Sequence, residues 1–213
     1  MLIKICGLST PETVAAALDS GADMIGLVFF PKSPRHVTLE QAAALADQAR
    51  GRADIVALVV DPADALLTGI AESVRPNWLQ LHGRETPQRV RDIRESVRLP
   101  VMKAVGVATE SDIQAALAFE GVADRLLLDA KAPVGAALPG GNGVPFDWRL
   151  LAGLDQQVRF MLSGGVDPAN VAQAVQLVRP WGVDVSSGVE NAPGVKDAGR
   201  IRAFVAAARS AVK

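Results

Sequence analysis

Residues 183–197 read VDVSSGVENAPGVKD and connect a predicted strand to a predicted helix. Two valines alternate with Asp184, which predicts a strand, and Ser187 and Gly188 break it ahead of a helical pattern over residues 197–212. Backbone N–H groups at such a turn, next to the positive end of a short helix, form a site for a phosphate or a carboxylate. The alternative is a plain turn between a strand and a helix.

The same order of apolar run, polar turn and helical pattern recurs along the whole chain. The predicted strands are residues 2–6, 24–29, 55–60, 78–81, 101–105, 125–129, 160–163 and 183–186. The predicted helices are residues 11–20, 39–50, 63–74, 87–97, 111–119, 146–154, 168–178 and 197–212. Regular alternation without a break in composition predicts an α/β fold, a single (β/α)8 TIM barrel that forms one domain over residues 1–213.

The alternative fold is an open, doubly wound parallel sheet. Such a sheet commonly carries G-x-G-x-x-G after its first strand, where this chain has Cys6-Gly7-Leu8-Ser9. The barrel is therefore favoured, and it predicts that the chemistry takes place where the strands end.

Charge and cysteine content exclude several classes of protein. The chain has 22 Lys and Arg against 23 Asp and Glu, so bulk attraction to nucleic acid or to anionic lipid is not expected. Cys6 is the only cysteine, which rules out an internal disulfide and favours a reducing compartment. The apolar start of the chain is too short for a signal peptide or a membrane span, and we expect a cytoplasmic protein.

Two strand ends carry groups suited to proton transfer. Cys6 ends the first strand, where a thiolate serves as a base if its pKa falls, whereas a lone cysteine is commonly a small buried hydrophobe. Asp129 ends the apolar sixth strand, and desolvation there would raise its pKa and keep it protonated as an acid. The alternative for Asp129 is a helix cap or an ion pair with Lys131. Lys4 shares a strand face with Cys6.

Other strand ends carry candidate binding groups. Arg35 follows the second strand in a loop with two prolines, where a guanidinium can bind a carboxylate with two hydrogen bonds, although many loop arginines are merely solvated. His82 ends the fourth strand and is a possible proton-transfer group or a structural histidine. Gly164 and Gly165 form a second glycine turn before a helix, next to Gly188, and this fold tends to bind phosphate with these last two loops.

Two further residues and one loop complete the set of candidate features. Lys103 lies within an apolar strand, which allows a Schiff-base lysine, but a paired interior lysine is the preferred interpretation. Asp61 precedes a proline and is predicted to cap a helix. The glycine-rich loop over residues 133–145 is predicted to be a lid or a binding loop.

Together these residues resemble the phosphoribosylanthranilate isomerase family of tryptophan biosynthesis. The resemblance is carried by KICG, GADMIGLVFFPKSPR, LQLHG, LLLDAK, GGNGVPFDW, LSGGV with DPANV, and GVDVSSGVE followed by PGVKD, in that order over nearly the whole chain. It implies the Amadori rearrangement of N-(5-phosphoribosyl)anthranilate to 1-(2-carboxyphenylamino)-1-deoxyribulose 5-phosphate by general acid–base catalysis, with no cofactor and no metal.

The resemblance also implies roles for single residues. Cys6 resembles the general base and Asp129 the general acid, Arg35 resembles the arginine that holds the anthranilate carboxylate, and Asp184 resembles a polar residue near the amine and hydroxyls. The family's phosphate site is matched by the backbone of Gly164, Gly165, Ser187 and Gly188. Gly143 in a neighbouring loop is expected to assist it. Asn142 departs from the threonine that is common in the family.

Alternative functions remain open on the sequence alone. A Schiff-base enzyme would use Lys103 or Lys4, and a noncatalytic protein could bind a phosphorylated ligand without needing a thiol at the mouth. An enzyme on this barrel that serves both the histidine and the tryptophan pathways would be expected to carry an aspartate at the first strand. This chain has Cys6 there, which contradicts that interpretation. The expected partner is a small phosphosugar, with no nucleic acid and no membrane, and the protein is expected to be a monomer or a homodimer.

Overall fold

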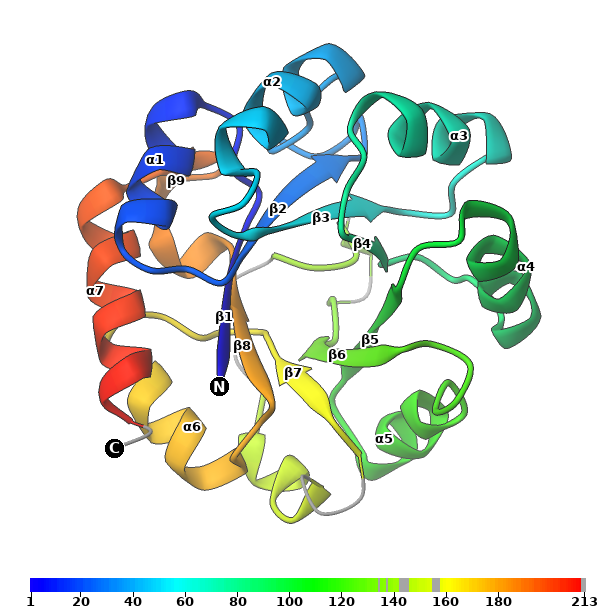
Figure 1. The fold of residues 1–213 in the computed structure, drawn as a ribbon. Helices are drawn as coiled ribbons and strands as arrows, with labels where there is room; N and C mark the ends of the chain where they lie inside the picture. The colour runs from blue at the N-terminus through cyan, green and yellow to red at the C-terminus, as the bar shows by residue number, and fades with distance from the viewer. Residues whose placement is uncertain (134, 137, 142–145, 155–157, 212–213) are drawn as a thin grey trace.

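The computed structural model describes residues 1–133, 135–136, 138–141, 146–154 and 158–211, and these form a closed parallel barrel (Figure 1). Its strands are β1 (Leu2–Cys6), β2 (Met24–Phe29), β3 (Asp54–Val59), β4 (Trp78–Leu81), β5 (Val101–Val107), β6 (Arg125–Ala130), β7 (Phe160–Leu162) and β8 (Gly182–Val185). Neighbours in sequence are neighbours in the barrel, and β8 pairs with β1 to close it. The predicted fold class is confirmed.

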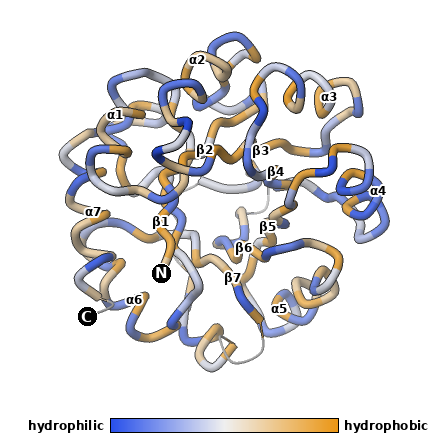
Figure 2. The backbone as a smooth tube through the Cα atoms, in the orientation of Figure 1, coloured by the Kyte–Doolittle hydropathy of each residue, from blue (hydrophilic) through white to orange (hydrophobic). Residues whose placement is uncertain are grey.

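Helices cover the outside of the barrel. They are α1 (Pro11–Asp19), α2 (Leu39–Ala49), α3 (Asp64–Ser73), α4 (Pro87–Val97), α5 (Glu110–Leu117), α6 (Val171–Val178) and α7 (Ala198–Ser210). The side chains of Thr10, Thr38, Thr86 and Thr109 accept hydrogen bonds from the first turns of α1, α2, α4 and α5, which satisfies N–H groups that have no helical partner. In Figure 2 the strands are mainly orange, whereas the helices mix blue and orange, as expected for helices with one face in solvent.

The strand alternation sorts the side chains between two sides of the sheet. Ile3 and Ile5 of β1 belong to the large apolar cluster between barrel and helices. The barrel interior contains a separate layer built from Met24, Val56, Met102, Ala104, Leu127 and Met161. Cys6 belongs to a third cluster with Val28 and Leu58 and lies on the interior side of the barrel.

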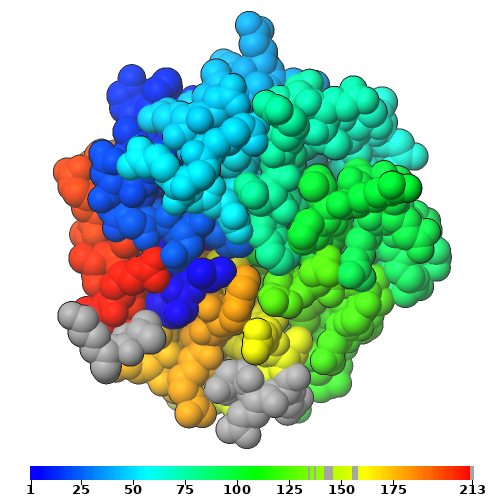
Figure 3. All heavy atoms as spheres, viewed as in Figure 1, coloured from blue at the N-terminus to red at the C-terminus, as the bar shows by residue number. Residues whose placement is uncertain are grey.

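The chain ends meet on one side of the ring. Arg209 of α7 donates a hydrogen bond to the backbone oxygen of Met1 over 2.8 Å, and Figure 3 shows the blue start of the chain next to the red α7. Within the described ranges, no helix has the length and apolar character needed to cross a membrane.

Two predictions about local structure are wrong. The stretch predicted as a helix over residues 146–154 forms no α-helix and instead contains the 3-10 turn η1 (Trp148–Leu151). Helix α3 begins after Ala63 without a side-chain cap; Asp61 has a φ of 45°, and its carboxylate accepts a hydrogen bond from the Arg84 backbone N–H.

A feature that was not predicted lies after β8. Between this strand and α7 the chain forms the short 3-10 turn η3 (Ser187–Val189) and then an antiparallel pair, β9 (Glu190–Ala192) and β10 (Val195–Lys196). This pair, residues 190–196, is called the β9–β10 hairpin below. The sequence predicted only a turn there.

Candidate active site

One pocket lies where the barrel strands end. The empty space of this pocket, open solvent included, is about 790 Å³. Its lining includes nine residues that the sequence singled out for binding or acid–base catalysis: Cys6, Arg35, His82, Asp129, Gly164, Gly165, Asp184, Ser187 and Gly188. Gly143 and Asn142 lie outside the described residues.

Cys6 lies above a buried ion pair. The ammonium of Lys4, fully buried, donates to Asp184 Oδ1 over 2.8 Å, and Asp184 Oδ2 lies 3.4 Å from the Ser163 hydroxyl that donates to it. A β-carbon built on Gly26 would lie 2.8 Å from Cys6 Sγ and 3.2 Å from Lys4 Nζ. Only glycine therefore fits beside the thiol and the ammonium.

The charges around Cys6 oppose one another. Burial is the largest effect and raises the pKa of the Cys6 thiol. The positive charges of Lys4 and Lys196 lower this pKa, whereas the negative charge of Asp184 raises it. Burial alone would lower the pKa of Lys4, but Asp184 and Cys6 raise it above its ordinary value. The sequence-based condition that the thiol pKa falls is therefore not met in the free protein, and the thiol form predominates near neutral pH. A thiolate of higher pKa is scarcer but is a stronger base.

This direction predicts the pH dependence of thiol alkylation. Iodoacetamide reacts with the thiolate, and Cys6 is the only cysteine, so the alkylation rate reports its ionisation. Because the pKa is raised above 9.0, the rate should reach half its maximum above pH 9.0, and Lys4→Met should move that midpoint higher. Lys131→Met, which removes an exposed charge paired with Asp112, should leave it unchanged. A wild-type midpoint below pH 8 would contradict this electrostatic description.

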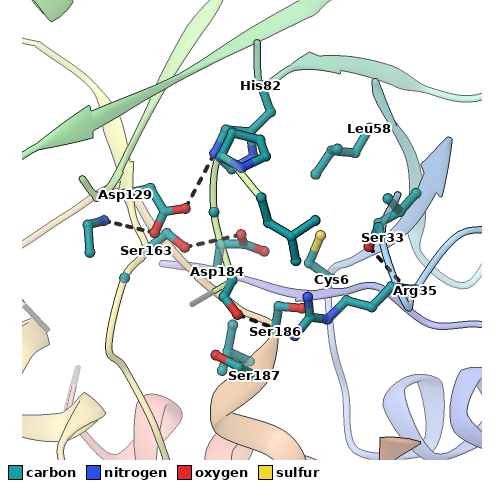
Figure 4. A pocket seen from close by; sticks show the side chains of 18 of the residues that line it. Cys6, Ser33, Arg35, Leu58, His82, Asp129, Ser163, Asp184, Ser186 and Ser187 are labelled. Atoms are coloured by element: carbon teal, nitrogen blue, oxygen red, sulfur yellow. Dashed lines mark hydrogen bonds and ion pairs between the residues drawn. The ribbon is translucent and has the colours of Figure 1, made fainter. Parts of the chain in front are cut away.

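Asp129 lies across the pocket from Cys6. Figure 4 shows the two side chains on opposite sides, and in the barrel β7 and β8 lie between their strands on the shorter way round. The Oδ2 atom of Asp129 lies 3.4 Å from His82 Nε2. At this orientation His82 Nε2 has no hydrogen-bond partner within the described chain. The predicted alternative, an ion pair with Lys131, is not found, because Lys131 binds Asp112 over 2.6 Å.

The described part of the loop after β6 extends over the pocket. A β-carbon on Gly140 would collide with Asp129 and His82, and one on Gly141 would lie 2.9 Å from Arg35 Nη1. Leu138 and Pro139 also line the pocket. The predicted binding loop thus spans from the carboxylate to the guanidinium.

Arg35 is buried rather than solvated. Its Nε donates to Glu190 Oε1 over 2.7 Å, and its Nη2 donates to Glu190 Oε2 over 2.8 Å. Lys196 Nζ donates to Glu190 Oε1 over 2.7 Å. Burial alone would raise the pKa of Glu190, but Arg35 and Lys196 hold it below its ordinary value.

Two glycine corners form the remaining wall. Gly164 and Gly165 have φ angles of 80° and 70°, in the left-handed region that favours glycine. A β-carbon on Gly164 would collide with the Ala130 backbone, and one on Gly188 with the Val166 backbone oxygen. The backbones of the last two barrel loops are therefore packed tightly against each other beside the pocket.

Both interior lysines are held in ion pairs. Lys103 Nζ donates to Glu85 Oε2 over 2.7 Å and to the Gly83 backbone oxygen over 2.8 Å, and it does not line the pocket that contains Cys6. The prediction of a paired interior lysine is confirmed. A Schiff-base mechanism would need Lys103 or Lys4 to leave a buried partner, which is costly.

Sequence reasoning did not single out three groups at this site. Glu190 and Lys196 lie within the quoted motif, but Glu190 contacts Arg35 across 155 residues of sequence, and Lys196 contacts Glu190 within the hairpin. Gln80 is fully buried, lines the pocket and has no hydrogen-bond partner within the described ranges. A polar residue in the middle of LQLHG was the only signal for it.

Comparison with known proteins gives a consistent result. The sequence model described as N-(5'phosphoribosyl)anthranilate (PRA) isomerase matches residues 3–207. The N-(5'-phosphoribosyl)anthranilate isomerase of Afipia carboxidovorans is 58% identical over 211 residues, which cover 99% of this chain and 90% of that protein.

Solved structures agree with the sequence matches. Phosphoribosyl anthranilate isomerase from Thermotoga maritima superposes with a TM-score of 0.89 at 37% identity and 99% coverage of each chain. A structure of phosphoribosyl anthranilate isomerase in complex with reduced 1-(o-carboxyphenylamino)-1-deoxyribulose 5-phosphate gives a TM-score of 0.85 at 36% identity, over 99% of this chain and 100% of that one. The chain therefore belongs to the N-(5'-phosphoribosyl)anthranilate isomerase family.

Proposed function

We propose that this protein catalyses the Amadori rearrangement of N-(5-phosphoribosyl)anthranilate in tryptophan biosynthesis, with Cys6 as general base and Asp129 as general acid. The observation that carries the assignment of roles is the position of the thiol and the carboxyl group across one pocket, on β1 and β6. An acid and a base on opposite sides of a bound sugar can act on different atoms of it without neutralising each other.

The first step opens the ribose ring. The acid form of Asp129 donates its proton to the furanose oxygen as the bond from that oxygen to C1′ breaks. The nitrogen lone pair of the anthranilate forms the C1′=N bond, which leaves a protonated Schiff base and a carboxylate on Asp129. His82 lies beside this carboxylate and can stabilise its charge if it is protonated.

The second step moves a proton from carbon to sulfur. The Cys6 thiolate removes the C2′ proton, and the C–H electrons form the C1′=C2′ bond while the C=N electrons return to nitrogen. The resulting enolamine gains a proton at C1′ and loses one from the C2′ hydroxyl to become the ketone. Lys4 lies beneath the thiol and stabilises the thiolate electrostatically.

The ends of the substrate supply its orientation. We propose that the backbone of Gly164, Gly165, Ser187 and Gly188 holds the phosphate, and that Arg35 holds the anthranilate carboxylate. A relative binds a reduced form of the product, which is a phosphosugar with the same two anionic ends. Two fixed ends restrict C1′ and C2′ to the space between Cys6 and Asp129, which lowers the entropic part of the barrier.

Several smaller predictions belong to the same proposal. The whole chain, residues 1–213, acts as one catalytic domain in the cytoplasm, on a small phosphosugar and without nucleic acid or a membrane. Asp184 contributes near the substrate amine and hydroxyls, although Lys4 already occupies one of its oxygens. The protein works as a monomer or a homodimer.

The proposed reaction is tested with purified protein and the fluorescent anthranilate adduct. The substrate and the rearranged product are isomers, so we expect fluorescence to fall while mass spectrometry detects a product of unchanged mass. Hydrolysis would instead release free anthranilate and ribose 5-phosphate. No acceleration over buffer, or acceleration of hydrolysis alone, would reject the proposed reaction.

Replacing Arg35 by alanine is expected to raise KM by at least about tenfold while kcat changes less. The reason is that a charge-assisted pair with the substrate carboxylate acts in the ground state and the transition state alike. Steady-state kinetics measures both constants. Lys32→Met, in the same loop but exposed, should change KM by less than about twofold. Unchanged KM and kcat in Arg35→Ala would remove Arg35 from the site.

A further inference from the structure

We propose that Lys196, acting through Glu190, is a positioning residue that keeps the guanidinium of Arg35 both correctly oriented and net positive toward the substrate carboxylate. This inference rests on the proposed role of Arg35. The β9–β10 hairpin, which carries both residues, would thereby determine how strongly the pocket selects a carboxylated aromatic ring over an unsubstituted one.

The orientation follows from which edge of the guanidinium is used. Glu190 accepts hydrogen bonds from Nε and Nη2, so it occupies one side of the Arg35 fork. Nη1 makes no hydrogen bond to the rest of the described chain, and Nη2, besides its bond to Glu190, has only a long contact of 3.4 Å to the Gly141 backbone oxygen. The end of the fork formed by Nη1 and Nη2 is therefore left for a second carboxylate, such as one on a ligand.

The hairpin and the loop of Arg35 are packed together. Gly194, at the hairpin turn, donates its backbone N–H to Glu190 Oε2 over 3.2 Å, which holds this carboxylate in place. A β-carbon on Gly194 would lie 2.6 Å from the Pro34 backbone oxygen, immediately before Arg35. The position of the guanidinium thus depends on the hairpin as well as on its own loop.

The charge count explains why a lysine is needed. Arg35 and Glu190 alone form a neutral pair, which would attract an incoming carboxylate only weakly. Lys196 gives the three groups one net positive charge. Its Nζ donates hydrogen bonds to Glu190 Oε1, to the Ser186 backbone oxygen and to the Ser186 hydroxyl, over 2.7, 2.8 and 3.1 Å. Its side chain is 1% exposed, so solvent screens this charge poorly.

The lysine charge depends on pH. Burial lowers the pKa of Lys196 to about 8, even though Glu190 and Cys6 raise it; Arg35 also lowers it. These groups face Lys196 from β9, from β1 and from the loop after β2, and Ser186 at the end of β8 is its neutral neighbour. A carboxylate bound at Arg35 would favour the ammonium, so carboxylate binding should weaken as pH rises through about 8.

The test compares two ligands that differ only in the carboxylate. Reduced 1-(o-carboxyphenylamino)-1-deoxyribulose 5-phosphate and its analogue with a plain phenyl ring are titrated into the full chain by calorimetry at pH 7 and pH 9. The ratio of the two Kd values isolates the carboxylate, because the phosphate and Cys6 affect both ligands. The variants are Lys196→Met, Arg35→Ala and the exposed control Lys32→Met.

At pH 7 we expect Lys196→Met to raise Kd for the carboxylated ligand by about tenfold, and Kd for the phenyl ligand by less than about twofold. In the wild type the preference for the carboxylate should fall several-fold between pH 7 and pH 9, and in Lys196→Met it should not change. Lys32→Met should match the wild type. The pH comparison needs no variant, so it holds even if Lys196→Met folds poorly.

The possible failures are distinguishable. If Arg35→Ala keeps the preference for the carboxylate, the proposed role of Arg35 is wrong. If Arg35→Ala loses that preference while Lys196→Met retains it and the wild type shows no change with pH, the carboxylate site stands and the role of Lys196 is rejected. Equal weakening of both ligands in Lys196→Met would indicate a merely structural lysine and would also reject it.

Discussion

Replacing Cys6 by alanine is expected to lower kcat by at least about 10²-fold while the protein stays folded. The reason is that the C2′ proton then has no base positioned against it, since the other titratable groups that act on the thiol are held in ion pairs: Lys4 with Asp184, and Lys196 with Glu190. Steady-state turnover of the anthranilate adduct measures the loss, and circular dichroism checks the fold.

Cys6→Ser is the matched control for size. A serine hydroxyl is a much weaker acid than a thiol, so it supplies almost no base near neutral pH, and the loss should be as large as in Cys6→Ala. Binding of the reduced product analogue should change little in either variant, because the sulfur acts on the proton in transfer. Turnover near the wild-type rate in Cys6→Ala would show that another group is the base.

Asp129→Asn is expected to lower kcat by at least about 10²-fold as well, because an amide keeps the shape of the carboxyl group but has no acidic proton to give the ring oxygen. The same turnover assay measures the loss. Asp129 Oδ2 lies 3.4 Å from His82 Nε2, and asparagine, which has the same shape, can keep this local packing.

His82 supplies the control for this second prediction. His82→Gln should reduce kcat by less than Asp129→Asn, because the histidine acts on the acid and not on the substrate. If His82→Gln removes the activity and Asp129→Asn keeps it, the histidine is the acid and the assignment is reversed.

The barrel could be predicted because its signals are local. Leu2–Cys6, Met24–Phe29 and Trp78–Leu81 have the predicted bounds, since each is a short apolar run ended by polar or glycine residues. The misses occurred where tertiary contacts override local preference. Asp61 looks like a helix cap in sequence, but its carboxylate binds the Arg84 backbone N–H of the next loop.

The site could be predicted in part for the same reason. A barrel brings all strand ends to one rim, so Cys6, Arg35 and Asp129 could be expected to meet without knowledge of their distances. The side chains that these residues contact could not be predicted from the sequence. Glu190 reaches Arg35 through a hairpin with no strong strand signal, and the rise in the Cys6 pKa depends on burial, which the sequence does not report.

The central claim is that the substrate lies with C1′ and C2′ between the sulfur of Cys6 and the carboxyl group of Asp129. The most direct measurement is a crystal structure of this protein with reduced 1-(o-carboxyphenylamino)-1-deoxyribulose 5-phosphate. We expect the phosphate on the backbone of Gly164, Gly165, Ser187 and Gly188, with C2 against Sγ and Asp129 on the other side of the sugar. A phosphate bound elsewhere, or a sugar that leaves Cys6 and Asp129 on the same side, would contradict the account.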